Sequence, residues 1–205
     1  MKRLPRSFYA RPVLEVARDA IGKVLVHETP EGRVSGRIVE AEAYSGPEDR
    51  AAHSYGGRRT ARTEVMFGPP GHAYVFFVYG MHWNFNLVTT AAGLPHAVLI
   101  RAVEPLEGIE LMAERRGIAA ARRELTNGPG KLCRAFAIDR AAYGSDLTRP
   151  ESPLYLLDGP PSKVARSPRI GVDYAGPWAA RLYRFYDPDS RYVSPFRRAG
   201  VARVK

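Results

Sequence analysis

Cysteine is nearly absent from the 205-residue sequence, where Cys133 is the only one. One thiol cannot form a disulfide within the chain, and it cannot build a zinc site from several thiolates. Long apolar runs are absent as well, because stretches such as 73–79 and 97–103 are far shorter than the about 20 residues that a membrane helix needs. The N-terminus has no apolar signal core. We therefore expect a cytoplasmic protein in a reducing compartment, with no membrane partner.

Lysine and acidic residues are also scarce relative to arginine. The 31 lysines and arginines outnumber 21 aspartates and glutamates, which gives a formal charge of +10 and a pI near 10.0, and only five of these cations are lysines. A basic surface suits a polyanionic partner, and the planar guanidinium matches phosphate bidentately. A genome-wide preference for arginine codons explains the arginine-to-lysine ratio equally well. The 45% hydrophobic and 25% charged composition is close to ordinary globular usage and indicates neither wholesale disorder nor a fibrous repeat.

Periodicity and turn residues predict one compact domain over residues 1–205, with no linker or internal repeat. The expected class is α+β, with flanking helices around a mostly antiparallel, curved β-sheet. Strands are expected at 23–27, 33–44, 73–79, 82–90, 97–103, 154–157, 164–172 and 181–186, and helices at 12–21, at 106–116 and after 127–130. Residues 45–71 have no sustained period, and a loop of this length is usually functional or disordered.

The end of the expected strand 33–44 carries the first group of candidate functional residues. Strand alternation places Glu40, Glu42 and Tyr44 on one side, and His53 follows in the loop. Apolar neighbours can shield Glu42 enough to tune its pKa for acid–base work. The plainer alternative is an edge-strand glutamate in water. An aromatic ring, an imidazole and a carboxylate in one segment favour a pocket.

The aromatic hairpin at 73–90 carries the second group. Aromatic and β-branched residues are typical of a half-buried strand, so most of Val75, Phe77 and Val78 are assigned to the core. Tyr79 differs because it lies beside a glycine at the tip of a hairpin in a basic protein, where a flat ring could wedge into a base stack. Phe76 and Tyr79 would face opposite sides of a regular strand, so the strand must twist or end near Tyr79.

Several separated motifs together resemble one enzyme family. These are I-V-E-A-E-A-Y-x-G-P-E-D-x-A-A-H-S, M-F, Y-V-x-x-x-Y-G-M, G-P-G-K-L-C at 128–133 and R-I-G-V at 169–172. They resemble the 3-methyladenine (alkyladenine) DNA glycosylase family, and the match covers most of the chain. The resemblance implies the fold of that family, as opposed to the helix-hairpin-helix glycosylases. It also implies that no cofactor is needed.

The resemblance implies a hydrolytic reaction on damaged DNA. Alkylated or deaminated purines, namely 3-methyladenine, 7-methylguanine and, as a further candidate, hypoxanthine, would be flipped from duplex DNA, and the N-glycosidic bond would be cut to leave an abasic site. Glu42 would activate the attacking water. Arg101 and a main-chain carbonyl near Ile170 would hold that water. The protein would act as a monomer, associated with the nucleoid of a bacterium or the nucleus of a eukaryote.

The resemblance also implies roles in base recognition. Tyr44 would stack on the extruded base, while His53 and Phe76 would line the rest of the pocket. Asn86 would crowd a purine 2-amino group and so disfavour guanine. Tyr79 would fill the space that the flipped nucleotide leaves. Phe76 departs from the family pattern, in which we expect a tyrosine, so substrate preferences that depend on that hydroxyl are in doubt.

Candidate DNA contacts are basic, polar or exposed residues in loops and near helix ends. They are Arg58, Arg59, Thr60, Arg62, Met81, Arg115, Arg116 and Lys131. Lys131 is also the candidate amine for a lyase mechanism, although its segment more simply opens a helix. The five histidines have no convincing ligand spacing, so no metal is expected. The alternative class is a non-catalytic nucleic-acid-binding module that has the basic surface and the intercalating tyrosine.

Overall fold

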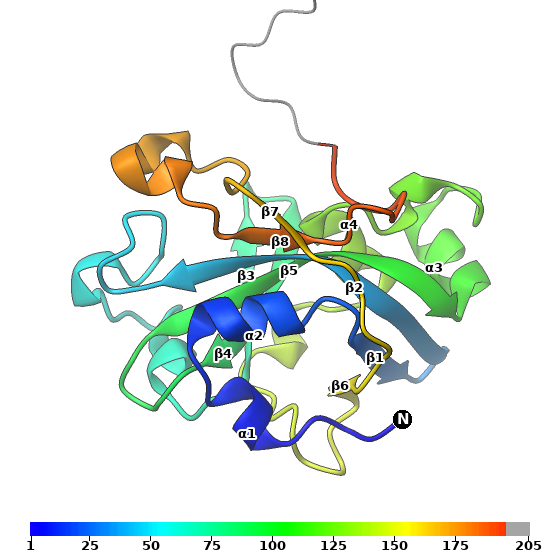
Figure 1. Ribbon diagram of the computed structural model, residues 1–205. Helices are drawn as coiled ribbons and strands as arrows, with labels where there is room; N and C mark the ends of the chain where they lie inside the picture. Colours follow the sequence, from blue (N-terminus) through cyan, green and yellow to red (C-terminus); the bar gives the residue numbers. More distant parts are fainter. Residues whose placement is uncertain (196–205) are drawn as a thin grey trace, which may run out of the picture.

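The long strand β2 organises the fold in the computed structural model, which describes residues 1–195 (Figure 1). The strands are β1 Val24–Thr29, β2 Gly32–Ser45, β3 Ala73–Val78, β4 His82–Thr89, β5 His96–Glu107, β6 Leu154–Leu157, β7 Ala165–Ser167 and β8 Arg184–Tyr186. They form one sheet in the order β3-β4-β5-β2-β1-β6, while β8 pairs with β2 and with β7. All of these pairs are antiparallel, as the turn-rich sequence predicts. The domain is α+β, and its sheet is curved and open.

Four short α-helices flank the sheet within residues 1–195. They are α1 Arg6–Tyr9, α2 Val13–Asp19, α3 Ile109–Arg116 and α4 Pro129–Ala135. The apolar residues of α2 and α4 join those of β2, β4 and β5 in one large core cluster. Figure 1 shows α2 running along one side of β2 and β5, while β8 lies beside β2 within the sheet and β7 lies beside β8. Among the described helices, none is long and apolar enough to cross a membrane.

A bulge in β2 decides which residues enter this core. Ile38 pairs with Val103 and Glu40 with Ala102, so Val39 is an extra residue on β2. An extra residue shifts the alternation by one step, and Ala41 therefore joins Ile38 in the core. Glu40 and the residues that alternate with it are left on the opposite face of the sheet.

Several element boundaries differ from the sequence-based expectation. The helix expected at 106–116 begins at Ile109, because β5 continues to Glu107 and Gly108 adopts a left-handed conformation with φ 68°. The strand expected at 164–172 covers only β7, since the chain turns away at Pro168, which has no N–H to donate. The strand expected at 181–186 shortens to β8, whose partner segment on β2 is also three residues long. α1 was not predicted.

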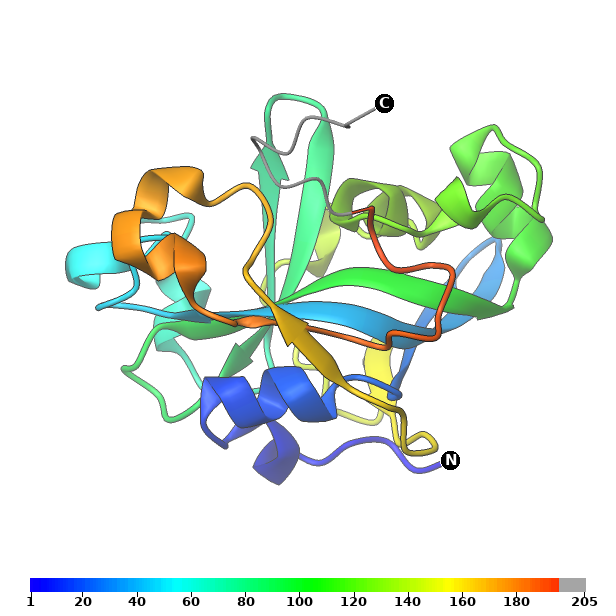
Figure 2. The same ribbon diagram turned by 45° about the horizontal axis from the view of Figure 1, so that its top comes forward.

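The β3–β4 hairpin extends beyond the rest of the sheet, as the blue-green ribbon in Figure 2 shows. β3 ends at Val78, and Tyr79 and Gly80 follow with φ values of 53° and 66°. The Met81 amide donates a hydrogen bond to the Val78 carbonyl at 3.1 Å. Two central residues with positive φ are typical of a type I′ turn, which matches the twist of the flanking strands. The predicted end of the strand near Tyr79 is confirmed.

Candidate functional site

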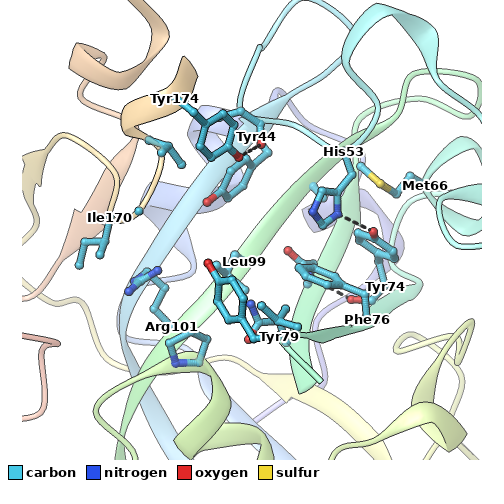
Figure 3. A pocket seen from close by; sticks show the side chains of 18 residues that line it. Tyr44, His53, Met66, Tyr74, Phe76, Tyr79, Leu99, Arg101, Ile170 and Tyr174 are labelled. Carbon is cyan, nitrogen blue, oxygen red and sulfur yellow. Dashed lines mark hydrogen bonds between the residues drawn. The ribbon is translucent and has the colours of Figure 1, made fainter. Parts of the chain in front are cut away.

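The floor of the candidate site is a row of side chains across the sheet. Antiparallel pairing aligns Tyr74 of β3, Asn86 of β4, Leu99 of β5 and Glu42 of β2. The first three line a cavity of about 310 Å³ (Figure 3). Its walls come from β2, β3 and β5, from the loop after β2, from the hairpin tip, from the start of α4 and from the segment after β7. The residues of these walls include Tyr44, Ala51, His53, Met66, Phe76, Tyr79, Arg101, Pro129, Ile170, Gly171, Val172 and Tyr174.

Glu42 lies directly behind the wall of this cavity. Its side chain is 0% exposed and accepts three hydrogen bonds. The Tyr44 hydroxyl donates at 2.8 Å and the Ile170 amide at 2.8 Å, while Nη1 of Arg101 donates at 3.3 Å. All three donors belong to residues that line the cavity. Burial and then the Glu42 carboxylate raise the pKa of Tyr44 well above its usual value, so its hydroxyl keeps the proton it donates.

Arg101 reaches this carboxylate from a second irregularity in the sheet. Glu40 pairs with Ala102 and Ala41 with Ile100, so Arg101 is the extra residue of a bulge on β5. Its Nε donates to Glu40 at 3.0 Å. Burial alone would lower the pKa of Arg101, but the neighbouring carboxylates of Glu42 and Glu40 outweigh it and raise the pKa. Arg101 is therefore a permanent cation at the pocket wall.

Aromatic rings form the opposite side of the cavity. The ring of His53 lies edge-on to Phe76, with centroids 4.5 Å apart, and its Nδ1 is 2.8 Å from the Tyr74 hydroxyl. Burial, together with the positive charges of Arg62 and Arg58, lowers the pKa of His53 to about 4. The imidazole is therefore neutral near pH 7. The side facing Tyr44 thus consists of flat, uncharged rings suited to stacking.

Tyr79 stands over the mouth of the cavity (Figure 3). Its side chain is 87% exposed, although it also contributes to the lining. The left-handed backbone of the turn directs it to the same side as Phe76, which regular strand alternation would not. A large exposed ring on a projecting hairpin can insert into a bound macromolecule without first losing packing contacts within the protein.

A buried ion pair supports the wall that holds Tyr44 and Ile170. Arg169 Nη1 donates to Asp49 Oδ2 at 2.5 Å and Nη2 to Oδ1 at 2.9 Å, with both side chains 0% exposed. Nη1 also donates to the Ala43 carbonyl at 2.8 Å. The guanidinium carbon lies over the Tyr44 ring, 4.7 Å from its centroid.

The residues predicted to contact DNA fall into two groups, according to whether their side chains already bind another residue of the protein. The side chains of Arg58 and Arg62 make no hydrogen bond or ion pair within residues 1–195, and Arg140, which was not predicted, resembles them. Arg62 and Arg140 line a second hollow, beside Phe77 and Trp83. Others have partners: Arg59 binds Glu64, Arg115 binds Glu31, Arg116 donates to the Leu125 carbonyl, Lys131 donates to Asn127, and Thr60 is 3.2 Å from Thr63. Met81 is exposed at the hairpin tip.

Most of the predicted pocket residues lie together. Tyr44, His53, Phe76, Asn86, Tyr79, Arg101 and Ile170 all line the cavity. Asn86 is held by a 3.0 Å hydrogen bond from its Nδ2 to the Tyr74 carbonyl. Glu42 differs, because it lies behind the wall and does not line the open space. Within residues 1–195, no three His, Cys, Asp or Glu side chains group as a metal ion would require.

Sequence reasoning missed the buried pair of Asp49 and Arg169. Both residues lie in motifs that were noted, G-P-E-D and R-I-G-V, but only Ile170 of the second motif was given a role. Tyr74 and Tyr174 were also missed as lining residues, since a tyrosine in a strand or loop has no pattern that marks it as part of a pocket.

Comparison with known proteins identifies the family of this chain. A family model described as "Methylpurine-DNA glycosylase (MPG)" matches residues 7–191. A protein of Methanocella arvoryzae is 55% identical over 192 residues, which cover 93% of this chain and 95% of that protein. One of Desulfitobacterium hafniense is 53% identical over 203 residues, which cover 95% of this chain and 99% of that protein. Both are named "Putative 3-methyladenine DNA glycosylase". Because these matches span nearly the whole chain, the protein belongs to the methylpurine-DNA glycosylase family.

Proposed function

We propose that this protein is a DNA glycosylase that flips alkylated purines out of duplex DNA and hydrolyses their N-glycosidic bonds. The observation that carries the proposal is a buried carboxylate, Glu42, set behind a cavity lined largely by aromatic rings, with the Arg101 cation in the wall beside the carboxylate. A pocket of this kind can hold a flat base between rings. The carboxylate lies behind the wall of that pocket, where we propose that it reaches one bound water.

Glu42 is proposed to deprotonate the attacking water. Of its three hydrogen bonds, the one from Arg101 is the longest, at 3.3 Å. A water entering between these two side chains would accept from Arg101 and donate to Glu42. As Glu42 takes the water's proton, the oxygen bonds to C1′ of the sugar and the N-glycosidic electron pair leaves with the base. Glu42 also stabilises the positive charge that develops on the sugar.

Alkylation supplies two reasons for selectivity. A damaged or mispaired base costs less to unstack, out of a total of a few kcal/mol. A 3-methyladenine or 7-methylguanine base is cationic in DNA, so rings such as Tyr44 and Phe76 attract it by about 1 to 2 kcal/mol when it is desolvated. The positive charge also makes it a good leaving group, which departs neutral. The general acid that glycoside hydrolysis usually requires is then dispensable for these bases, whereas hypoxanthine would still benefit from one.

The remaining features support a monofunctional enzyme that works alone on the duplex. Lys131, the candidate amine for a lyase reaction, does not line the cavity and donates to Asn127. Tyr79 is placed to fill the gap that the extruded nucleotide leaves. Asn86 is proposed to crowd a purine 2-amino group and so to disfavour normal guanine. No step of this scheme requires a second subunit or a cofactor.

The test separates an enzyme from a binding module. Wild-type protein and Glu42→Gln are incubated with alkylated duplex DNA, and free base is measured by chromatography while DNA affinity is measured by anisotropy. We expect wild type to release 3-methyladenine and 7-methylguanine, and the variant to bind DNA about as tightly but release little base. If wild type releases none, or the variant releases as much, Glu42 is not the catalytic group.

A further inference from the structure

The Tyr44 ring has a cation on its far side. Arg169 lies over this ring but does not line the cavity, so the guanidinium is behind the face that a base would meet. Tyr183 lies on Arg169 as well, with its centroid 5.3 Å from the guanidinium carbon. Arg169 and Tyr183 therefore lie behind the Tyr44 ring, away from the candidate base-binding site.

An isolated cation in this position would oppose the function proposed above. The attraction between a ring and a cationic base depends on the negative potential of the ring face. A guanidinium on one face reduces that potential on the other, and it also repels a cationic base through the ring. Asp49 removes this conflict, because it binds both terminal nitrogens of Arg169 in a bidentate, fully buried pair.

The same pair fixes the position of the wall. Asp49 Oδ1 accepts the Ala51 amide at 3.0 Å and Oδ2 accepts the Ser45 amide at 3.2 Å, which ties the start of the loop after β2. Arg169 holds the Ala43 carbonyl, and the next residue, Ile170, donates to Glu42. The Asp49–Arg169 pair therefore sets both the charge behind the Tyr44 ring and the position of the pocket wall. A test must separate these two effects.

We propose that Asp49 is a specificity-determining residue, which sets the preference for cationic bases by neutralising Arg169 behind the Tyr44 ring. The inference rests on the proposed glycosylase function. Asp49 itself touches no substrate in this scheme and acts through Arg169 and Tyr44.

Variants that leave opposite charges behind the ring distinguish this role from simple loss of packing. Asp49→Asn leaves the Arg169 cation unbalanced, whereas Arg169→Gln leaves the Asp49 anion unbalanced. Each is made in a Glu42→Gln background, so that no base is released during binding. Affinity is measured by anisotropy for two duplexes that differ in one nucleotide, which carries either cationic 7-methylguanine or neutral hypoxanthine. The preference for the cationic base is the dissociation constant for the hypoxanthine duplex divided by that for the 7-methylguanine duplex.

We expect Asp49→Asn to lower the preference for the cationic base roughly tenfold, and Arg169→Gln to raise it, as a unit charge within about 10 Å of the base in a partly buried site requires. Shifts in one direction for both variants, or no shift beyond about twofold, would overturn the inference. If circular dichroism shows that Asp49→Asn does not fold, Arg169→Gln decides alone, and a preference that is unchanged or lower overturns the inference. Release of 7-methylguanine by wild type is measured in parallel, and its absence would refute the proposed function instead.

Discussion

At the scale of single residues, burial converts ordinary side chains into specialised ones. Glu42 has no contact with solvent and takes all its hydrogen bonds from residues of the pocket wall. Arg101 carries its charge between two carboxylates. His53 is kept neutral by burial and by nearby arginines. Each of these states depends on neighbours from other strands and loops, and each has consequences that can be measured.

The low pKa of His53 predicts a pH dependence of stability. Because this pKa, about 4, lies below the ordinary value of 6.5, the unfolded chain binds more protons between these two pH values. The free energy of unfolding should therefore fall as the pH decreases from about 6.5 to about 4, and His53 should contribute no change above about pH 7. We expect the thermal midpoint of wild type to drop more over this range than that of His53→Gln.

The comparison between the two proteins cancels the contribution of carboxylates that titrate in both. Histidine NMR provides a direct check, since the His53 ring should keep its neutral chemical shifts at pH 5. A ring that titrates near pH 6.5, or equal drops in the two midpoints, would show that the imidazole is not shielded in this way.

At the scale of elements, the β3–β4 hairpin projects beyond the rest of the sheet (Figure 2). Tyr79 has a left-handed backbone, which is uncommon for a large side chain and is often found at functional sites. We expect Tyr79→Ala to slow base release from duplex DNA by roughly tenfold, because the wedge compensates part of the few kcal/mol needed for unstacking. Release from single-stranded DNA should change little, since a single strand has no partner strand to hold the base.

Tyr79→Phe is the matched control, because it keeps the ring and removes only the hydroxyl. It should retain most of the duplex activity. Equal losses on duplex and single-stranded DNA for Tyr79→Ala would mean that the ring serves the pocket and does not act as a wedge.

Some features of β2 and of the β3–β4 hairpin could be predicted from the sequence, and others could not. Local alternation correctly placed Glu40, Glu42 and Tyr44 on one side of β2, and turn residues correctly located the aromatic hairpin. The bulges at Val39 and Arg101 could not be predicted, because a bulge depends on the register of two strands that are far apart in sequence. The burial of Glu42 behind the wall follows from those bulges and from the Ile170 amide, which a distant segment supplies.

The buried pair of Asp49 and Arg169 was not predicted because its two residues are far apart in the sequence. Asp49 and Arg169 are 120 residues apart, and neither carries a periodic or spacing signal that links it to the other. The segment from 173 to 180 was also not predicted, since its 3₁₀ turns contain Gly176 and Pro177 and follow no helical period. Such features become visible only when tertiary structure brings the segments together.

At the scale of the whole molecule, the net charge is +10, and some arginines pair with acidic side chains whereas others do not. Arg58, Arg62 and Arg140 lack side-chain partners within residues 1–195, and Arg62 and Arg140 share a hollow beside the hairpin. Arg59, in the same loop, is instead neutralised by Glu64 through two hydrogen bonds. This contrast provides a matched pair of variants in one short segment.

We expect Arg62→Gln to reduce the slope of log affinity against log salt concentration by about 0.9, the value for one lost phosphate contact on duplex DNA. Arg59→Gln should reduce it less, because that cation already has a partner. The slopes are measured by anisotropy on an undamaged duplex between low and moderate salt. Equal slopes for wild type and Arg62→Gln would remove this arginine from the DNA-binding surface.

The proposed mechanism requires that Glu42 itself, and not simply the charge network around it, drives base release. Glu40 supplies the control, because it is equally buried on the same strand and binds the same arginine. The most direct measurement is the single-turnover rate of 7-methylguanine release from duplex DNA by wild type, Glu42→Gln and Glu40→Gln, with enzyme in excess. Loss of a positioned base costs about 10²- to 10⁴-fold, so Glu42→Gln should fall within or below that range while Glu40→Gln stays within roughly tenfold of wild type. Similar rates for the two variants would contradict the account.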